Sequence, residues 1–314
     1  MLIEEHANYT LIVGDAADRA KFAATIALAK AMPVYTGGAG PSVVQMREGA
    51  LRLADSPLAR QASTQVEISP VTVRGIPAAW FRARELRREA PLLYFHGGGF
   101  VCGSVEGSRG IVAALALVFA APILAVGYAQ SPERPFPAAV EDARASYEWL
   151  TLHSPHAITL VGESAGGALA LSTALHAARH GRRPPRAVIA CSPWFDLTMS
   201  GASWTTNAGQ DLVTREMGDF FRDSYLAGAD PRSPDISPLN QDLSDAPPLL
   251  IQVGSRELGL DDSRALIAKA QGAGRRPRFE IYQDLPHGFL KFLSPIGDIA
   301  IQRMADWEKT LGVL

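Results

Sequence analysis

The sequence predicts an α/β protein with a mostly parallel, eight-stranded sheet that carries helices on both faces. Short apolar segments alternate with helical patterns along most of the 314 residues. The segments are apolar almost throughout, which is typical of strands that are buried on both sides. A serine turn framed by glycines at 162–166 joins one such strand directly to a helix, a connection that also favours this class.

The expected strands begin with a hairpin. Residues 65–73 and 78–84 alternate apolar and polar side chains on either side of a turn at Gly75. Six short apolar strands follow, and most of them are separated by helices. These strands are expected at 92–95, 122–126, 158–161, 187–191, 249–253 and 278–282, and the helices at 108–119, 137–153, 165–180, 261–272 and 294–311.

Two segments break the alternation. Residues 1–60 hold helix-forming pieces interrupted by a run of glycines and prolines. Residues 195–245 contain no convincing strand and only one clear helical pattern, at 214–227. Open α/β sheets bind ligands beyond the carboxyl ends of their strands, so an insertion of this size is expected to form a lid there.

The composition argues against several classes of function. Lys and Arg total 30 against 32 Asp and Glu, so no overall field attracts nucleic acid or an anionic membrane. Two cysteines, Cys102 and Cys191, make neither a disulfide framework nor a zinc spacing. The first residues lack the pattern of an export signal, and the longest apolar stretch is shorter than the about 20 residues that span a bilayer. We therefore expect a soluble, cytoplasmic protein with no membrane span and no metal.

The Gly-Glu-Ser-Ala-Gly run at 162–166 predicts that Ser164 is a nucleophile. Small residues are needed in this turn because the serine sits on strained backbone and its neighbours approach other parts of the chain closely. The turn lifts the hydroxyl clear of the sheet, and the helix that follows favours negative charge at its amino terminus.

His96 and three glycines follow the strand expected at 92–95. Glycines after a strand expose backbone N–H groups, as an oxyanion hole requires, although a plain glycine turn with a structural histidine would look the same. His96 is interpreted as structural under either reading.

His287 is the expected general base, because it lies in the loop after the last strand and follows the serine along the chain. The acid that orients it should lie after the strand at 249–253. Glu257 occupies that loop, while Asp261 is the second choice, since a helix cap also explains it.

Taken together, these motifs resemble the hormone-sensitive lipase family of the α/β-hydrolase fold, particularly its bacterial esterases. The resemblance covers about residues 66–292. The matching motifs are HGGGF at 96–100, YAQSPERPFPAAVEDA at 128–143, GESAGG at 162–167, SPWFDL at 192–197, GSRELGLDDS at 254–263 and PHGF at 286–289.

The resemblance implies a catalytic triad of Ser164, Glu257 and His287, although the family's acid is normally an aspartate. It also implies a helical cap built from residues 1–60 and about 195–245, on a catalytic domain at 61–314. The implied oxyanion donors are the backbone N–H groups of Gly98, Gly99 and Ala165.

The expected activity is that of a serine carboxylesterase, which hydrolyses short- to medium-chain, mainly uncharged esters through an acyl-enzyme without a cofactor. Apolar residues that flank the motifs either line its pocket or belong to the core; these are Phe100, Trp194, Phe195 and Leu258. The same triad could act on amides, lactones or carbonates. A non-catalytic receptor, as in the plant gibberellin receptors, is disfavoured because His287 is present. Related esterases often pair through the sheet edge or the last helix, so a homodimer is left open.

Overall fold

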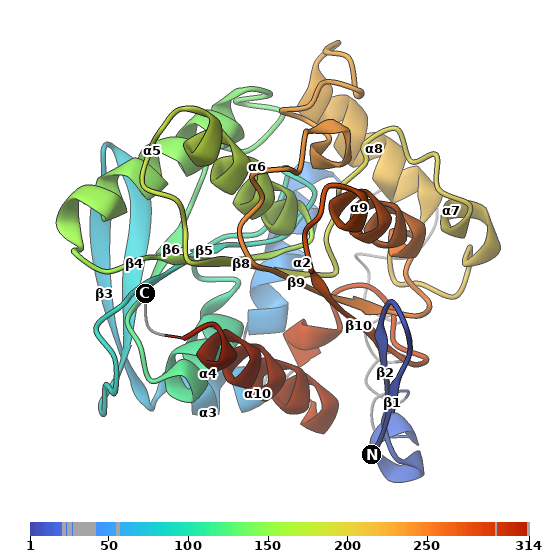
Figure 1. Cartoon of the computed structure of the whole chain (residues 1–314), viewed down its shortest axis with the longest axis horizontal. Helices are drawn as coiled ribbons and strands as arrows, with labels where there is room; N and C mark the ends of the chain where they lie inside the picture. The colour runs from blue at the N-terminus through green and yellow to red at the C-terminus, as the bar shows by residue number, and fades with distance from the viewer. Residues whose placement is uncertain (21–22, 24–26, 28–41, 55–56, 293, 313–314) are drawn as a thin grey trace.

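One mixed sheet of ten strands runs through the molecule (Figure 1), in the order β1-β2-β10-β9-β8-β7-β5-β6-β4-β3. The computed structural model describes all residues except 21–22, 24–26, 28–41, 55–56, 293 and 313–314. The strands are β1 (Leu2–Glu5), β2 (Thr10–Val13), β3 (Val66–Val73), β4 (Ile76–Ala83), β5 (Leu92–Phe95), β6 (Ile123–Val126), β7 (Thr159–Glu163), β8 (Ala187–Cys191), β9 (Leu249–Gly254) and β10 (Arg278–Tyr282).

The prediction of a mostly parallel sheet is confirmed, and the expected number of eight strands is wrong. The two extra strands form the hairpin β1–β2, and β2 pairs in parallel with β10, Thr10 lying opposite Glu280. The β-branched residues of β2 favour a strand, but its partner comes from the far end of the chain, which no local pattern reveals. Part of the segment 1–60 lies outside the described residues, and the hairpin shows that this segment is not purely helical.

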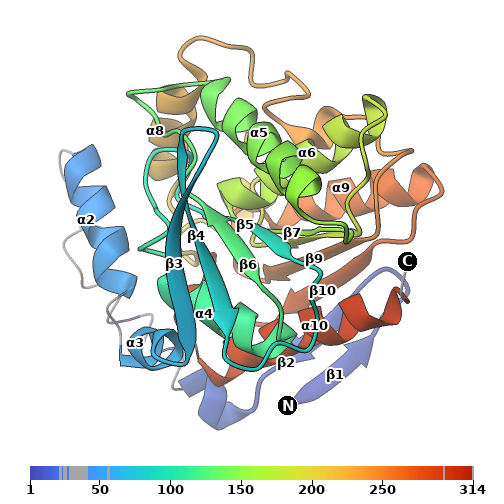
Figure 2. The ribbon, with the colours of Figure 1, turned by 90° about the vertical axis from the view of Figure 1, so that its left-hand side faces the viewer.

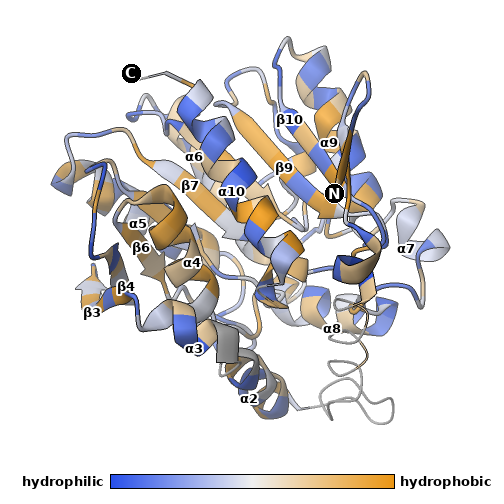
Figure 3. Cartoon of the chain, turned by 90° about the horizontal axis from the view of Figure 1, so that it is seen from below, coloured by the Kyte–Doolittle hydropathy of each residue, from blue (hydrophilic) through white to orange (hydrophobic). Residues whose placement is uncertain are grey.

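The centre of the sheet is parallel from β10 to β6 and is buried along its whole length. Every residue of β5, β6, β7, β8 and β9 is buried. Hydrophobic residues accordingly predominate in β9 (Figure 3). Helices must therefore cover both faces of these strands.

The helices lie in two layers, with α5, α6 and α9 over one face and α4 and α10 over the other (Figure 2). None of the helices within the described residues has both the length and the apolar character needed to cross a bilayer. The bounds are α2 (Val43–Ala54), α3 (Pro57–Ser63), α4 (Arg109–Phe119), α5 (Ala138–His153), α6 (Ala165–Arg179), α7 (Ser203–Thr206), α8 (Arg215–Leu226), η2 (Pro238–Asn240), α9 (Leu260–Gly272), η3 (Phe289–Phe292) and α10 (Pro295–Thr310).

The carboxylate of Glu308, on α10, ties this helix to the sheet. It accepts hydrogen bonds from Arg88 (2.6 Å), Arg186 (2.7 Å) and Thr159 (2.9 Å), and the residue is 1% exposed. Burial by itself would raise the pKa of Glu308, but the hydrogen bonds and charges of the two arginines outweigh it, so the pKa is lowered. The ionised carboxylate thus stabilises the fold above its unfolded pKa, and this stabilisation is lost as the pH falls through the lower folded value.

Glu308→Gln is expected to lower the free energy of unfolding at pH 7 by about 2–4 kcal/mol, because two guanidinium groups lose their buried counter-charge. Urea unfolding followed by circular dichroism measures this loss. Asp306→Asn, which breaks an exposed pair with Lys309 on the same helix, should cost less than about 1 kcal/mol. The interpretation is wrong if the Glu308→Gln deficit is as large at pH 3.5 as at pH 7.

Candidate active site

Ser164 sits in a sharp turn between β7 and α6 with φ 55° and ψ −122°. Two glycines make this turn sterically feasible. A Cβ on Gly162 would lie 2.0 Å from the carbonyl oxygen of Gly166, and one on Gly166 would lie 2.0 Å from that of Phe95. The backbone N–H of Ser164 donates to the carbonyl of Cys191 at 2.9 Å. The strained serine is therefore held between neighbouring strands, with its side chain at their carboxyl ends.

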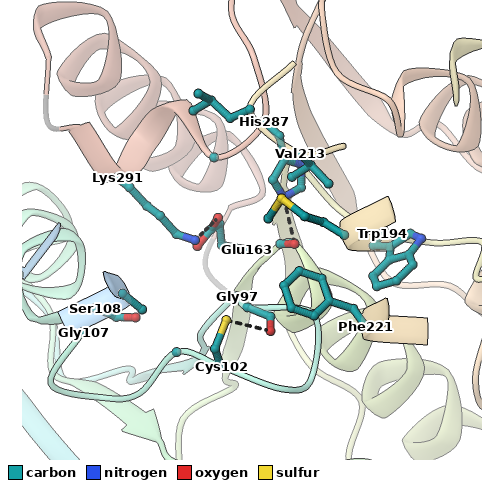
Figure 4. Close-up of a pocket in the computed structure, with 18 of the residues that line it drawn as sticks. Gly97, Cys102, Gly107, Ser108, Glu163, Trp194, Val213, Phe221, His287 and Lys291 are labelled. Carbon is teal, nitrogen blue, oxygen red and sulfur yellow. Dashed lines mark hydrogen bonds and ion pairs between the residues drawn. The ribbon is translucent and has the colours of Figure 1, made fainter. Parts of the chain in front are cut away.

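His287 lies between Ser164 and Glu257, and Figure 4 shows it among the residues that line a cavity. Its Nε2 is 2.9 Å from Ser164 Oγ, and its Nδ1 is 3.2 Å from Glu257 Oε2. This geometry suits a neutral imidazole that receives a proton at Nε2 while Nδ1–H donates to a carboxylate.

Glu257 is fully buried, and its second oxygen is satisfied by the scaffold. Oε1 accepts hydrogen bonds from Ser192 Oγ (2.7 Å) and from the backbone N–H of Gly254 (2.6 Å). The orientation of the Glu257 carboxylate is thus fixed independently of its contact with His287. Asp261 lies elsewhere, because its carboxylate accepts the N–H of Ser203 and pairs with Arg264.

The pKa of His287 is raised above its ordinary value. Burial is the largest influence and lowers it, but the hydrogen bond and the charge of Glu257 outweigh burial, and the charge of Asp211 adds to the rise. The neutral, proton-accepting form of His287 therefore becomes dominant only as the pH rises through this elevated value.

The loop after β5 carries Gly98 and Gly99, two of the three residues expected to donate hydrogen bonds to an oxyanion. Gly98 and Gly99 have φ angles of 121° and 61°, and a Cβ on Gly98 would lie 2.1 Å from the carbonyl oxygen of Cys102. No other described residue accepts a hydrogen bond from the amides of Gly98, Gly99 or Ala165. All three border the serine turn or the cavity above it, so they are available to a ligand oxygen.

His96 supports this loop from below. Its Nδ1 donates to the carbonyl of Gly97 at 2.8 Å, its ring stacks on Tyr128, and burial lowers its pKa to about 4. A histidine that is neutral and buried in this way fits the structural role expected from the sequence.

A cavity opens above Ser164, and two of the four expected lining residues border it. Trp194 and Leu258 line the cavity, whereas Phe100 and Phe195 lie in the core at 1% and 0% exposure. Phe100 takes a positive φ, and its ring stacks on that of Tyr225 at 3.9 Å, which directs it away from the cavity. Residues from the two irregular segments complete the wall and were not predicted: Met46, Ala50, Ala59, Leu212, Val213, Met217 and Phe221.

Asp211, in the insertion between β8 and β9, was also missed by the sequence analysis. Its Oδ1 accepts the backbone N–H of His287 at 2.6 Å, and its Oδ2 accepts that of Leu258 at 2.8 Å. The residue is 5% exposed. One buried carboxylate therefore joins the loop of the histidine to the loop of Glu257. No motif around Asp211 indicates this, because both of the loops that it joins are distant from it in sequence.

Within the part of the chain that the structure describes, no group of three or more His, Cys, Asp or Glu side chains is arranged to hold a metal ion.

Comparisons with known proteins agree with this geometry. A family model described as alpha/beta hydrolase fold matches residues 92–291. An acetyl-hydrolase from Streptomyces hygroscopicus is 44% identical over 223 residues, which make up 69% of this chain and 73% of that protein. An esterase from Acinetobacter venetianus is 31% identical over 262 residues, 80% of this chain and 85% of that protein. A solved esterase of the bacterial hormone-sensitive lipase family has a TM-score of 0.86 at 34% identity, covering 95% of this chain and 100% of that chain.

Asp211→Asn is expected to lower the pKa of His287, because it removes a negative charge that raises it. Titration of the histidine ring by NMR measures this shift directly. Asp219→Asn changes an exposed carboxylate of α8 in the same insertion and should leave the titration of His287 where it is in the wild type. An unchanged or higher His287 pKa in Asp211→Asn would contradict the electrostatic role of Asp211.

Proposed function

This chain belongs to the bacterial hormone-sensitive lipase family of esterases on the α/β-hydrolase fold, and we propose that it is a serine esterase for short- to medium-chain, mainly uncharged esters. As a carboxylic ester hydrolase it needs a nucleophile, a base and an oxyanion site. The observation that carries the proposal is the 2.9 Å hydrogen bond between Ser164 Oγ and His287 Nε2, with Glu257 at Nδ1.

Acylation is the first half of the proposed reaction. Ser164 Oγ attacks the carbonyl carbon of the ester, and its proton passes to His287 Nε2. The carbonyl oxygen becomes an oxyanion, which accepts hydrogen bonds from the amides of Gly98, Gly99 and Ala165. When the tetrahedral intermediate collapses, the bond to the alcohol oxygen breaks, and His287 returns its proton to the departing alcohol.

Deacylation uses the same groups in reverse. A water molecule attacks the acyl carbon and gives one proton to His287. The second oxyanion accepts hydrogen bonds from the same three amides. The bond from Ser164 Oγ to the acyl carbon then breaks, the serine recovers its proton, and the carboxylic acid leaves. Glu257 remains ionised throughout and stabilises the imidazolium form of His287.

The expected substrate size follows from the side chains around the cavity. Trp194, Trp204, Val213, Phe221 and Leu258 give it an apolar wall, which favours uncharged acyl chains of modest length. We further propose that residues 1–60 and 195–245 act as the cap of a catalytic domain at 61–314, since both segments contribute lining residues.

Free, buried thiols at Cys102 and Cys191 are compatible with the cytoplasmic location that we propose. A homodimer stays a prediction of the family resemblance.

Ser164→Ala is expected to lower kcat on p-nitrophenyl butyrate by a factor on the order of 10⁶, because the members of a triad act as a unit. Wild type and variant are both assayed on a series of p-nitrophenyl esters from acetate to laurate. The loss of activity in the variant tests whether Ser164 is the nucleophile, and the wild-type rates give the preferred length of the acyl chain. We expect higher kcat/KM on the short and medium chains than on laurate. Folded wild-type protein that hydrolyses no ester of the series would overturn the proposal.

Glu257→Gln is expected to lower kcat by a factor on the order of 10⁴, as removal of a triad carboxylate does. Its effect on pH dependence has a definite sign. Without the charge of Glu257, burial lowers the pKa of His287, so the acid limb of kcat/KM moves to lower pH. Asp261→Asn is the matched comparison and should keep the wild-type profile. The reverse pattern, with Asp261→Asn the more damaged variant, would reassign the acid.

A further inference from the structure

The two sides of the cavity differ in chemistry. In Figure 4, Trp194 and Phe221 lie on one side of the cavity, and Glu163 and Lys291 lie toward the other side, with Ser108 beyond them. Four residues with polar side chains, defined here as the polar wall, come from four separate elements and line this second side: Tyr94 of β5, Ser108 before α4, Glu163 of β7 and Lys291 of η3. An esterase for plain alkyl esters has no need of such a wall.

Glu163 brings a buried carboxylate next to the nucleophile. It is 2% exposed, and neither of its oxygens makes a hydrogen bond to a described residue, while Lys291 Nζ forms an ion pair with Oε1 at 3.0 Å. A Cβ on Gly97 would lie 2.8 Å from Glu163 Oε2 and 3.0 Å from the Cβ of Ser164. The carboxylate of Glu163 and the side chain of Ser164 therefore both lie against Gly97.

Tyr94 and Ser108 add hydroxyl groups to this wall. Tyr94 is 2% exposed, and its Oη has no hydrogen-bond partner among the described residues. Ser108 precedes α4, but its hydroxyl makes no capping hydrogen bond to the helix. Burial raises the pKa of the Tyr94 phenol well above its usual value and the charge of Glu163 adds to the rise, so the phenol stays protonated. Buried polar groups without partners are costly, and a polar ligand relieves that cost.

We propose that the polar wall binds a hydroxyl group on the alcohol part of the ester, so that hydroxylated alcohols are the preferred leaving groups. This rests on the proposed esterase function. A hydroxyl both donates and accepts, which matches a wall that offers a carboxylate, an ammonium and two hydroxyls. The charges of Glu163 and Lys291 offset each other, so a charged leaving group gains little there.

The order of residues after His287 explains why the alcohol part faces this wall. His287 Nε2 must reach the departing oxygen to protonate it, so the alcohol lies beside the histidine. Gly288 follows His287 directly, and a Cβ on Gly288 would lie 3.3 Å from Glu163 Oε1, which is paired with Lys291 four residues after the histidine. An alcohol held at the histidine therefore extends toward Glu163 and Lys291.

A matched pair of esters tests the proposal: 2-hydroxyethyl butyrate and propyl butyrate share the acyl group and differ by a hydroxyl in place of a methyl. The expected wild-type preference for the hydroxylated ester is on the order of tenfold in kcat/KM, the worth of a hydrogen bond that involves a charged group. Glu163→Gln, Ser108→Ala and Tyr94→Phe should each bring this ratio toward one. Lys309→Met removes an exposed ammonium on α10 and should keep the wild-type ratio.

The outcomes separate this proposal from the esterase function. A wild-type ratio near one, or a loss of both esters in equal proportion in Ser108→Ala and Tyr94→Phe, would overturn the hydroxyl site. Faster hydrolysis of the butyrate ester of 3-hydroxypropanoic acid, whose alcohol part carries a carboxylate, than of 2-hydroxyethyl butyrate would overturn it in favour of an anion site. Hydrolysis of propyl butyrate that disappears in Ser164→Ala supports the esterase function whichever way the ratio falls. Glu163→Gln changes a buried charge, so the thermal unfolding of each variant is measured together with its kinetics. If Glu163→Gln is unfolded, Ser108→Ala and Tyr94→Phe, which each remove one hydroxyl oxygen, test the hydroxyl site.

Discussion

The strained turn at Ser164 fixes the point around which the other functional groups are arranged. A residue with φ 55° costs about 1–3 kcal/mol and persists only where its surroundings hold it in place. Here the neighbouring chain does so: the Ser164 N–H donates to Cys191, and its carbonyl accepts the N–H of Trp194 at 3.2 Å. Because β7 lies in the middle of the sheet, the loops after β5, β8, β9 and β10 all reach the serine. The glycine loop, Glu257 and His287 can therefore each reach Ser164 from a short loop at the end of its own strand.

His287 and Glu257 are held by groups other than Ser164. Ser192 Oγ donates to Glu257 and accepts the N–H of Gly288, and Asp211 accepts the N–H groups of His287 and Leu258. Asp211 comes from the insertion between β8 and β9, which also supplies part of the cavity wall. Any displacement of this segment would therefore move His287 as well as the cavity wall. A shift of about 1 Å in the position of a reacting group can lower a reaction rate by about 10²-fold.

Glu163, directly before Ser164, places a buried carboxylate beside the serine, and such a group is tolerable only with a counter-charge. Lys291 supplies that charge from the helix η3, which follows His287. The ion pair gives one wall of the cavity a polar character, while Trp194, Phe221 and Leu258 give the opposite wall an apolar one. Two chemically distinct sides next to one serine provide the physical basis for selecting between the acyl and the alcohol parts of an ester.

The sequence by itself determined most of the elements and pointed to Ser164, Glu257 and His287, which the structure brings together. The strands at 92–95, 187–191 and 278–282 lie where the apolar pattern predicts them, and the turn around Ser164 follows from its glycines. These features depend on local periodicity and on turn sterics, which neighbouring residues encode. Only the tertiary structure decided that β2 joins β10, that Phe100 and Phe195 fill the core, and that Glu257 and Asp211 reach the loop of His287. Those contacts join residues far apart along the chain, and the packing of the whole sheet and cap selects among side chains that look equivalent in the sequence.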